Sequence, residues 1–106
     1  MATKEKLKGS FGSLIDTLTN RFDPLQPPDI VAAWTSLLTR CAASARNTEA
    51  WARLPDESPD FDPIIHALDD STRAIVNADP GNPGETGAAL QATSHALDLL
   101  EQLLVD

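Results

Sequence analysis

Apolar residues recur along this chain at intervals of three and four, in four segments separated by three proline-containing breaks. Such spacing places apolar side chains on one face of an α-helix, so each segment predicts an amphipathic helix. Prolines mark the breaks because they lack a backbone N–H and fit the first turn of a helix or the loop outside it. The predicted helices cover residues 4–21, 28–54, 62–78 and 85–104.

The second predicted helix contains the one uncertain boundary. Its apolar stripe starts at Ile30 and keeps its phase as far as Ala52, which favours one continuous helix. Asn47 and Thr48 are a plausible interruption, since either side chain can cap a new helix. Trp51 lies just beyond them, off the centre of the stripe, and tryptophan often anchors protein interfaces. Trp51 is therefore a candidate partner-binding residue, and packing beneath the loop at 55–62 is the alternative.

The last predicted helix has a wider apolar arc than one neighbouring helix would cover. Beside its main stripe lies a row of small and apolar side chains that merges into Leu103. Two neighbouring helices of the same fold would account for this arc. Otherwise, an exposed apolar row marks a docking site for a partner or a second copy. The partner-binding candidates on this helix are Ala92, Ala96, Leu99 and Leu103.

Composition agrees with a helical fold, because Ala and Leu are the commonest residues and Tyr is absent. A length of 106 residues is typical of one domain. The breaks between the predicted helices are short enough to join antiparallel neighbours. We therefore predict an all-α, single-domain, antiparallel up-down-up-down four-helix bundle with proline-rich loops.

Charge divides the chain into two unlike halves. Residues 1–53 contain seven Lys or Arg and five Asp or Glu, a net charge of +2, whereas residues 54–106 contain one and eleven, a net charge of −10. An acidic surface of this kind favours a basic protein partner and disfavours phosphates and anionic membranes. The predicted acidic surface consists of Asp56, Glu57, Asp60, Asp62, Asp69, Asp70, Asp98 and Glu101.

Candidate metal and catalytic motifs are weak. His66 and His95 precede aspartates at helical spacing, but both fall on polar faces that point outward. The acidic stretch at 56–62 alternates oxygen donors like the start of a calcium loop, yet it lacks the turn glycine and the closing glutamate. No hydrolase or zinc-protease motif is present. We expect no metal, no cofactor and no enzymatic activity.

Cellular context follows from the cysteine and from hydropathy. Cys41 is the only cysteine and lies in an apolar stripe, which predicts a buried thiol in a reducing compartment. No stretch approaches the roughly 20 apolar residues that span a bilayer, and the N-terminus lacks the apolar core of a secretory signal. These features predict a cytoplasmic protein that does not contact membranes.

Two functions fit these features. The first is a small acidic protein–protein interaction module, an accessory or adaptor subunit of a larger bacterial complex, with self-association as a further possibility. The alternative is an inhibitor whose carboxylates imitate nucleic-acid phosphates and block a DNA- or RNA-binding protein. Direct nucleic-acid binding is not expected, because the basic residues form no continuous stripe.

Overall fold

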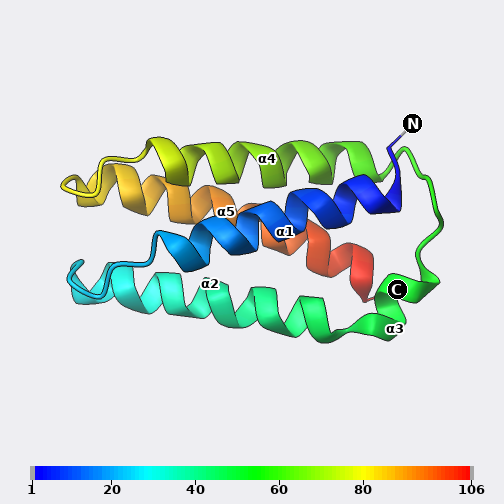
Figure 1. Ribbon diagram of the computed structural model, residues 1–106, viewed down its shortest axis with the longest axis horizontal. Coiled ribbons are helices and arrows are strands. Elements are labelled where there is room, and N and C mark those ends of the chain that lie inside the picture. Colours follow the sequence, from blue (N-terminus) through cyan, green and yellow to red (C-terminus); the bar gives the residue numbers. More distant parts are fainter. Residues whose placement is uncertain (1, 106) are drawn as a thin grey trace.

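The computed structural model describes residues 2–105, and these residues form five helices and no strand (Figure 1). The prediction of a compact all-helical fold is confirmed. The helices are α1 (Lys4–Asn20), α2 (Pro28–Arg46), α3 (Thr48–Arg53), α4 (Phe61–Asn77) and α5 (Pro83–Leu104).

Local capping chemistry explains where the long helices begin. The Thr3 side chain accepts a hydrogen bond from the Lys6 backbone N–H at 3.1 Å and starts α1. Asn82 caps α5 in the same way, and Pro83 occupies the favoured first position after it. Pro28 begins α2, where the missing backbone N–H costs no hydrogen bond. These starts lie within two residues of the predicted ones.

The predicted continuous helix over 28–54 is wrong, because the chain breaks at Asn47. Asn47 has a ψ of 64°, far from the helical value of about −42°. Its side chain accepts a hydrogen bond from the Ala50 backbone N–H at 3.3 Å, which caps a new helix, α3. The end of α3 is held by Lys4, whose ammonium donates to the backbone oxygens of Trp51 and Leu54 at 3.2 and 3.0 Å.

Helix packing differs from a bundle in which every neighbour is antiparallel. The most extensive contacts join α4 to α5 and α1 to α4, followed by α2 with α5, whereas α1 and α2 touch less. Successive long helices alternate in direction, yet α1 runs parallel to α4, and α2 runs parallel to α5 (Figure 1). Each helix of the first half therefore packs mainly on a helix of the second half.

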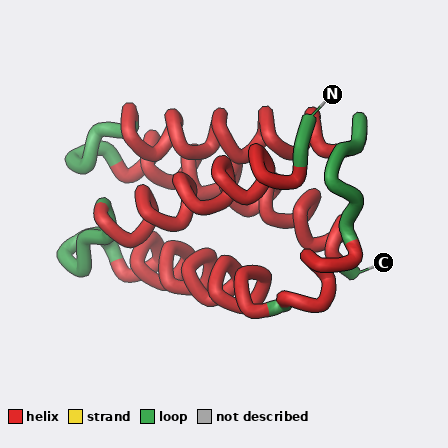
Figure 2. The backbone as a smooth tube through the Cα atoms, turned by 45° about the vertical axis from the view of Figure 1, so that its right-hand side comes forward, coloured by secondary structure: helices red, strands yellow, loops and turns green. Residues whose placement is uncertain are grey.

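Loops gather at the two ends of the molecule (Figure 2). At one end, the turns at 21–27 and 78–82 lie side by side and are joined by a hydrogen bond from Gln26 Nε2 to the Pro80 oxygen at 3.2 Å. At the other end, the link from α3 to α4 pairs with the N-terminal segment. There the Lys4 N–H donates to the Asp56 oxygen at 2.7 Å, and the Ser58 N–H donates to the Ala2 oxygen at 3.1 Å.

The core contains leucines from all four long helices. Burying each leucine stabilises the fold by roughly 1.5–3 kcal/mol. Trp34 of α2 joins this core, because its indole N–H donates to the Leu18 oxygen at 2.8 Å and its ring meets Phe22 edge-on. The largest side chains with almost no exposed surface are Phe61, Leu7, Leu14, Leu18, Leu68, Leu97 and Leu100.

Candidate protein-binding surface

The outer flank of α5 is the first candidate surface. We define it as Ala88, Ala92, Leu99 and Leu103. Ala88 and Ala92 are exposed, whereas Leu99 and Leu103 are half-buried and pack against the core. Three of the four residues predicted for partner binding on this helix thus keep accessible surface.

Ala96 is the exception on α5, because it has no exposed surface and belongs to the core. The wide apolar arc arises because α5 packs against both α4 and α2. Small side chains of α5, among them Ala89 and Ala96, are buried in this packing. The accessible part of the arc is narrower than the sequence pattern indicated.

Trp51 is also a core residue and keeps 7% of its surface exposed. Its ring stacks on Phe11 of α1, with ring centroids 5.9 Å apart, and its indole N–H donates to the Ser44 oxygen at 2.9 Å. The Lys8 ammonium lies 6.0 Å from the centre of the same ring. Trp51 therefore ties α3 to α1 and α2, and its burial leaves little surface for a partner.

Arg40 pairs with two of the carboxylates that the sequence assigned to the acidic surface. Its guanidinium lies between α2 and α5 and bonds to Asp98 at 2.5 Å and to Glu101 at 2.8 and 3.0 Å. Ser94 accepts a further hydrogen bond at 2.9 Å. The bond to Glu101 is the main cause that raises the pKa of Arg40 above its ordinary value, so this cation stays charged. Sequence reasoning missed Arg40 because its partners lie about sixty residues away, beyond any local spacing.

The other acidic residues differ in pairing and in exposure. Asp70 pairs with Arg73 one turn along α4. Asp69 lies beside it on α4 and is half-buried. The remaining four side chains are exposed at the opposite end of α4 from the 78–82 turn: Asp56, Glu57, Asp60 and Asp62.

Cys41 is buried, as its apolar neighbours predicted, with 1% of its surface exposed. Removal from water raises the pKa of its thiol to about 11, so at neutral pH the sulfur is a thiol and not a nucleophilic thiolate. Within residues 2–105, no three His, Cys, Asp or Glu side chains lie close enough to hold one metal ion. None of the helices described is both long and apolar enough to cross a membrane.

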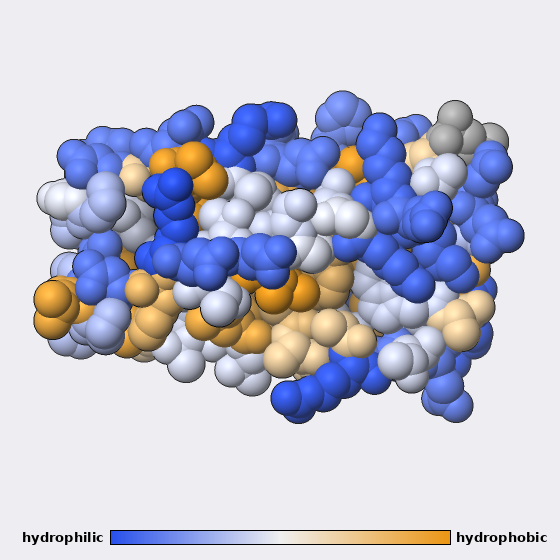
Figure 3. Space-filling view, in the orientation of Figure 1, coloured by the Kyte–Doolittle hydropathy of each residue, from blue (hydrophilic) through white to orange (hydrophobic). Residues whose placement is uncertain are grey.

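The face formed by α1 and α2 carries a second apolar strip. Figure 3 shows apolar side chains along the seam between these helices, surrounded by hydrophilic ones. The half-buried residues Ile15, Phe22 and Leu38 come from these helices and the turn that joins them. This strip lies on the opposite side of the helix arrangement from the α4–α5 seam.

Comparisons of the chain with protein-family models, with curated proteins and with solved structures found no match.

Proposed function

We propose that this protein is a protein-binding module, an accessory or adaptor subunit of a larger bacterial assembly, with no catalytic role of its own. The binding surface is the outer flank of α5, and the partner is a protein with a basic surface. In this proposal the helices form a rigid bundle that presents the flank, and the module works in the cytoplasm.

The observation that carries the proposal is the residual exposure of Leu99 and Leu103. Both leucines remain half-buried after α5 has packed against α2 and α4. The exposed alanines Ala88 and Ala92 extend the same flank toward the start of α5. A helix face of small residues with two leucines allows another helix to approach closely, as in helix-in-groove recognition.

Charge would orient the partner and add to the rate of association. The second half of the chain has a net charge of −10, and Arg73 is its single cation. Four carboxylates near the start of α4 are exposed, and the structure gives no ion pair to any of them within residues 2–105. Complementary charge of this kind raises association rates more than affinity.

The test is affinity capture from a lysate of the source organism with tagged protein, comparing wild type, Ala92→Arg and Ala43→Arg. Both alanines are exposed on helices, so neither arginine disturbs the core. A partner that binds wild type and Ala43→Arg but not Ala92→Arg supports the proposal. Equal capture by all three proteins contradicts it.

The salt dependence of capture separates the proposal from nucleic-acid mimicry. Hydrophobic docking on α5 should survive a high-salt wash, whereas binding by phosphate-like carboxylates should weaken steeply with ionic strength. Three of the eight predicted acidic residues, Asp70, Asp98 and Glu101, already pair with arginines of the same chain. This internal pairing favours the adaptor function over mimicry.

A further inference from the structure

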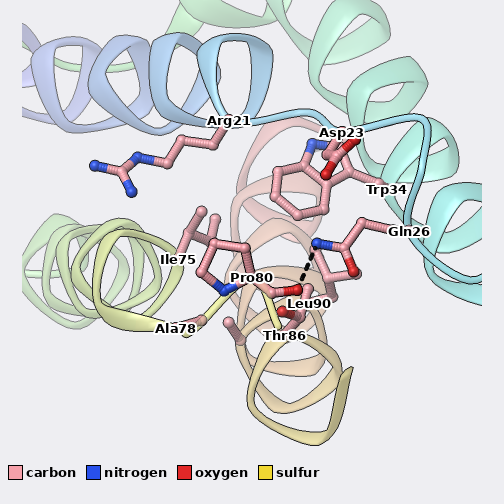
Figure 4. Close-up of a pocket in the computed structure, with 10 residues that line it drawn as sticks. Arg21, Asp23, Gln26, Trp34, Ile75, Ala78, Pro80, Thr86 and Leu90 are labelled. Atoms are coloured by element: carbon pink, nitrogen blue, oxygen red, sulfur yellow. Dashed lines mark hydrogen bonds between the residues drawn. The ribbon is translucent and has the colours of Figure 1, made fainter. Parts of the chain in front are cut away.

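A cavity of about 240 Å³ opens at the end of the molecule where the 21–27 and 78–82 turns meet (Figure 4). Its floor consists of five side chains that are each 4% exposed: Trp34, Ile75, Thr86, Ala89 and Leu90. Three helices contribute to this floor, so the shape of the floor is set by the core and not by the loops. Pockets with an apolar floor and a few polar groups are the usual form of small-molecule sites.

Thr86 is the polar group in the floor, and its hydroxyl makes no hydrogen bond within residues 2–105. The contrast with Thr93 is informative, because that buried hydroxyl donates to the Ala89 oxygen one turn earlier at 2.8 Å. No buried side-chain polar atom of the described residues lacks a hydrogen-bond partner, so the Thr86 hydroxyl keeps accessible surface in the cavity. Thr86 therefore makes the floor polar at one point.

The mouth of the cavity is polar. Gln26 reaches across it to the Pro80 oxygen, which uses the amide nitrogen and leaves the amide oxygen as an acceptor. One oxygen of Asp23 accepts the Leu25 N–H at 2.9 Å, and the other oxygen has no partner within the described chain. Arg21 also lines the cavity, but its side chain extends away from Trp34, and its guanidinium donates to the Val76 oxygen at 3.4 Å.

We propose that this cavity binds a small primary amine with a compact apolar body. The apolar body lies against Trp34, Ile75 and Leu90, and the ammonium group donates to Asp23 and Gln26 at the mouth. Acceptor oxygens are what an ammonium group needs, because it has three donors and no acceptor. The face of Trp34 adds cation–π attraction for the same charge.

Size and charge both limit the ligand. A cavity of about 240 Å³ accommodates a single ring or a short branched chain, not a nucleotide or a peptide. The protein has a net charge of −8, which draws cations toward its surface and repels carboxylates. The site is separate from the α5 flank, since it lies at the loop end and uses none of the flank residues.

The test is an NMR titration of the full chain with three probes of nearly equal size: benzylamine, benzyl alcohol and benzoate. The indole N–H signal of Trp34 reports on the cavity, and that of Trp51, at the other end of the molecule, is an internal control. We expect a saturable shift of the Trp34 signal, with benzylamine binding about three- to fivefold more tightly than benzyl alcohol, as one partly exposed ion pair would give. Benzoate should bind most weakly.

Variants test the charged contact at the mouth. Asp23→Asn retains the oxygen that accepts the Leu25 N–H but loses the charge, so it should abolish the preference for the amine. Asp16→Asn removes an equal charge from an exposed site on α1 and should preserve that preference.

Three results would overturn the proposal. One is the absence of a saturable shift at Trp34, and another is an equal shift of both indole signals, which means non-specific binding. The third is binding of benzyl alcohol or benzoate at least as tightly as benzylamine, which excludes an amine site.

Discussion

Arg40 on α2 binds Glu101 on α5 through two hydrogen bonds, from Nε to Oε2 at 3.0 Å and from Nη2 to Oε1 at 2.8 Å. The planar guanidinium matches the two carboxylate oxygens, so this contact fixes direction as well as distance. The pair sets the position of α2 along α5, and these two helices run parallel (Figure 1).

Arg40→Ala should lower the free energy of unfolding by about 1 kcal/mol, since the paired side chains are partly exposed and solvent weakens the contact. Urea denaturation measures this change. Arg73→Ala is the matched control, because its pair with Asp70 is fully on the surface and its loss should change stability by less than about 0.5 kcal/mol. Equal losses in the two variants would show that Arg40 does not lock α2 to α5.

Cys41 predicts a dependence of stability on alkaline pH. Burial raises the pKa of the folded thiol from its ordinary value of 9.0 to about 11. The unfolded chain therefore loses its thiol proton first, and stability should fall as the pH rises from about 9 to about 11, by up to about 2–3 kcal/mol. Below about pH 9 the thiol is protonated in both the folded and the unfolded chain, so this loss of stability does not occur.

Cys41→Ala provides the comparison, because it lacks the thiol and keeps every lysine and arginine. Urea denaturation at several alkaline pH values should show a shallower decline for the variant than for wild type. Parallel declines in the two proteins would mean that Cys41 does not titrate in this range.

Asn47→Ala should lower the free energy of unfolding by about 1 kcal/mol, because it removes the cap of α3. Asn47→Asp should lose much less, since aspartate also caps helices. Asn77→Ala, at the exposed end of α4, is the control. An increase in both helicity and stability for Asn47→Ala would instead support the continuous helix, because alanine is the better residue inside a helix.

Leu99→Asp should abolish partner capture and also reduce stability by about 1–2 kcal/mol, since Leu99 is half-buried against the core. Ala92→Arg should abolish capture with stability unchanged. Circular dichroism and thermal unfolding measure the stability of both variants. If a folded Leu99→Asp variant still captures the partner, Leu99 is not part of the interface.

Helix ends were predictable from the sequence because their causes are local. Pro28 identifies one helix start, and Asn47 and Thr48 identify the site of the break, whereas α5 begins at Pro83, two residues before its predicted start. The apolar pattern nevertheless favours a continuous helix, because it runs on through Ala45 and Ala52. Both of these alanines are exposed, while Ser44, Ala50 and Trp51 are buried in their place.

The candidate surface was harder to predict, because side-chain exposure depends on contacts between distant segments. Trp51 is buried through its stacking on Phe11, forty residues earlier in the chain, and no local pattern shows this contact. The sequence predicts free carboxylates at Asp98 and Glu101, because no local spacing indicates that Arg40 pairs with both. The exposed flank of α5 was predicted in part, because helical periodicity determines which residues share a face.

The parallel pairing of α1 with α4 and of α2 with α5 makes the molecule an intramolecular complex of two hairpins. Within the first hairpin α1 and α2 touch little, whereas α4 and α5 of the second hairpin pack extensively, so the first hairpin depends on its contacts with the second. The link at 54–60 keeps the two hairpins close together, while the contacts between the hairpins supply the free energy of their association. A chain cut within this link should therefore remain assembled. Leucines from both halves and the ion pairs of Arg40 with Asp98 and Glu101 would hold it together.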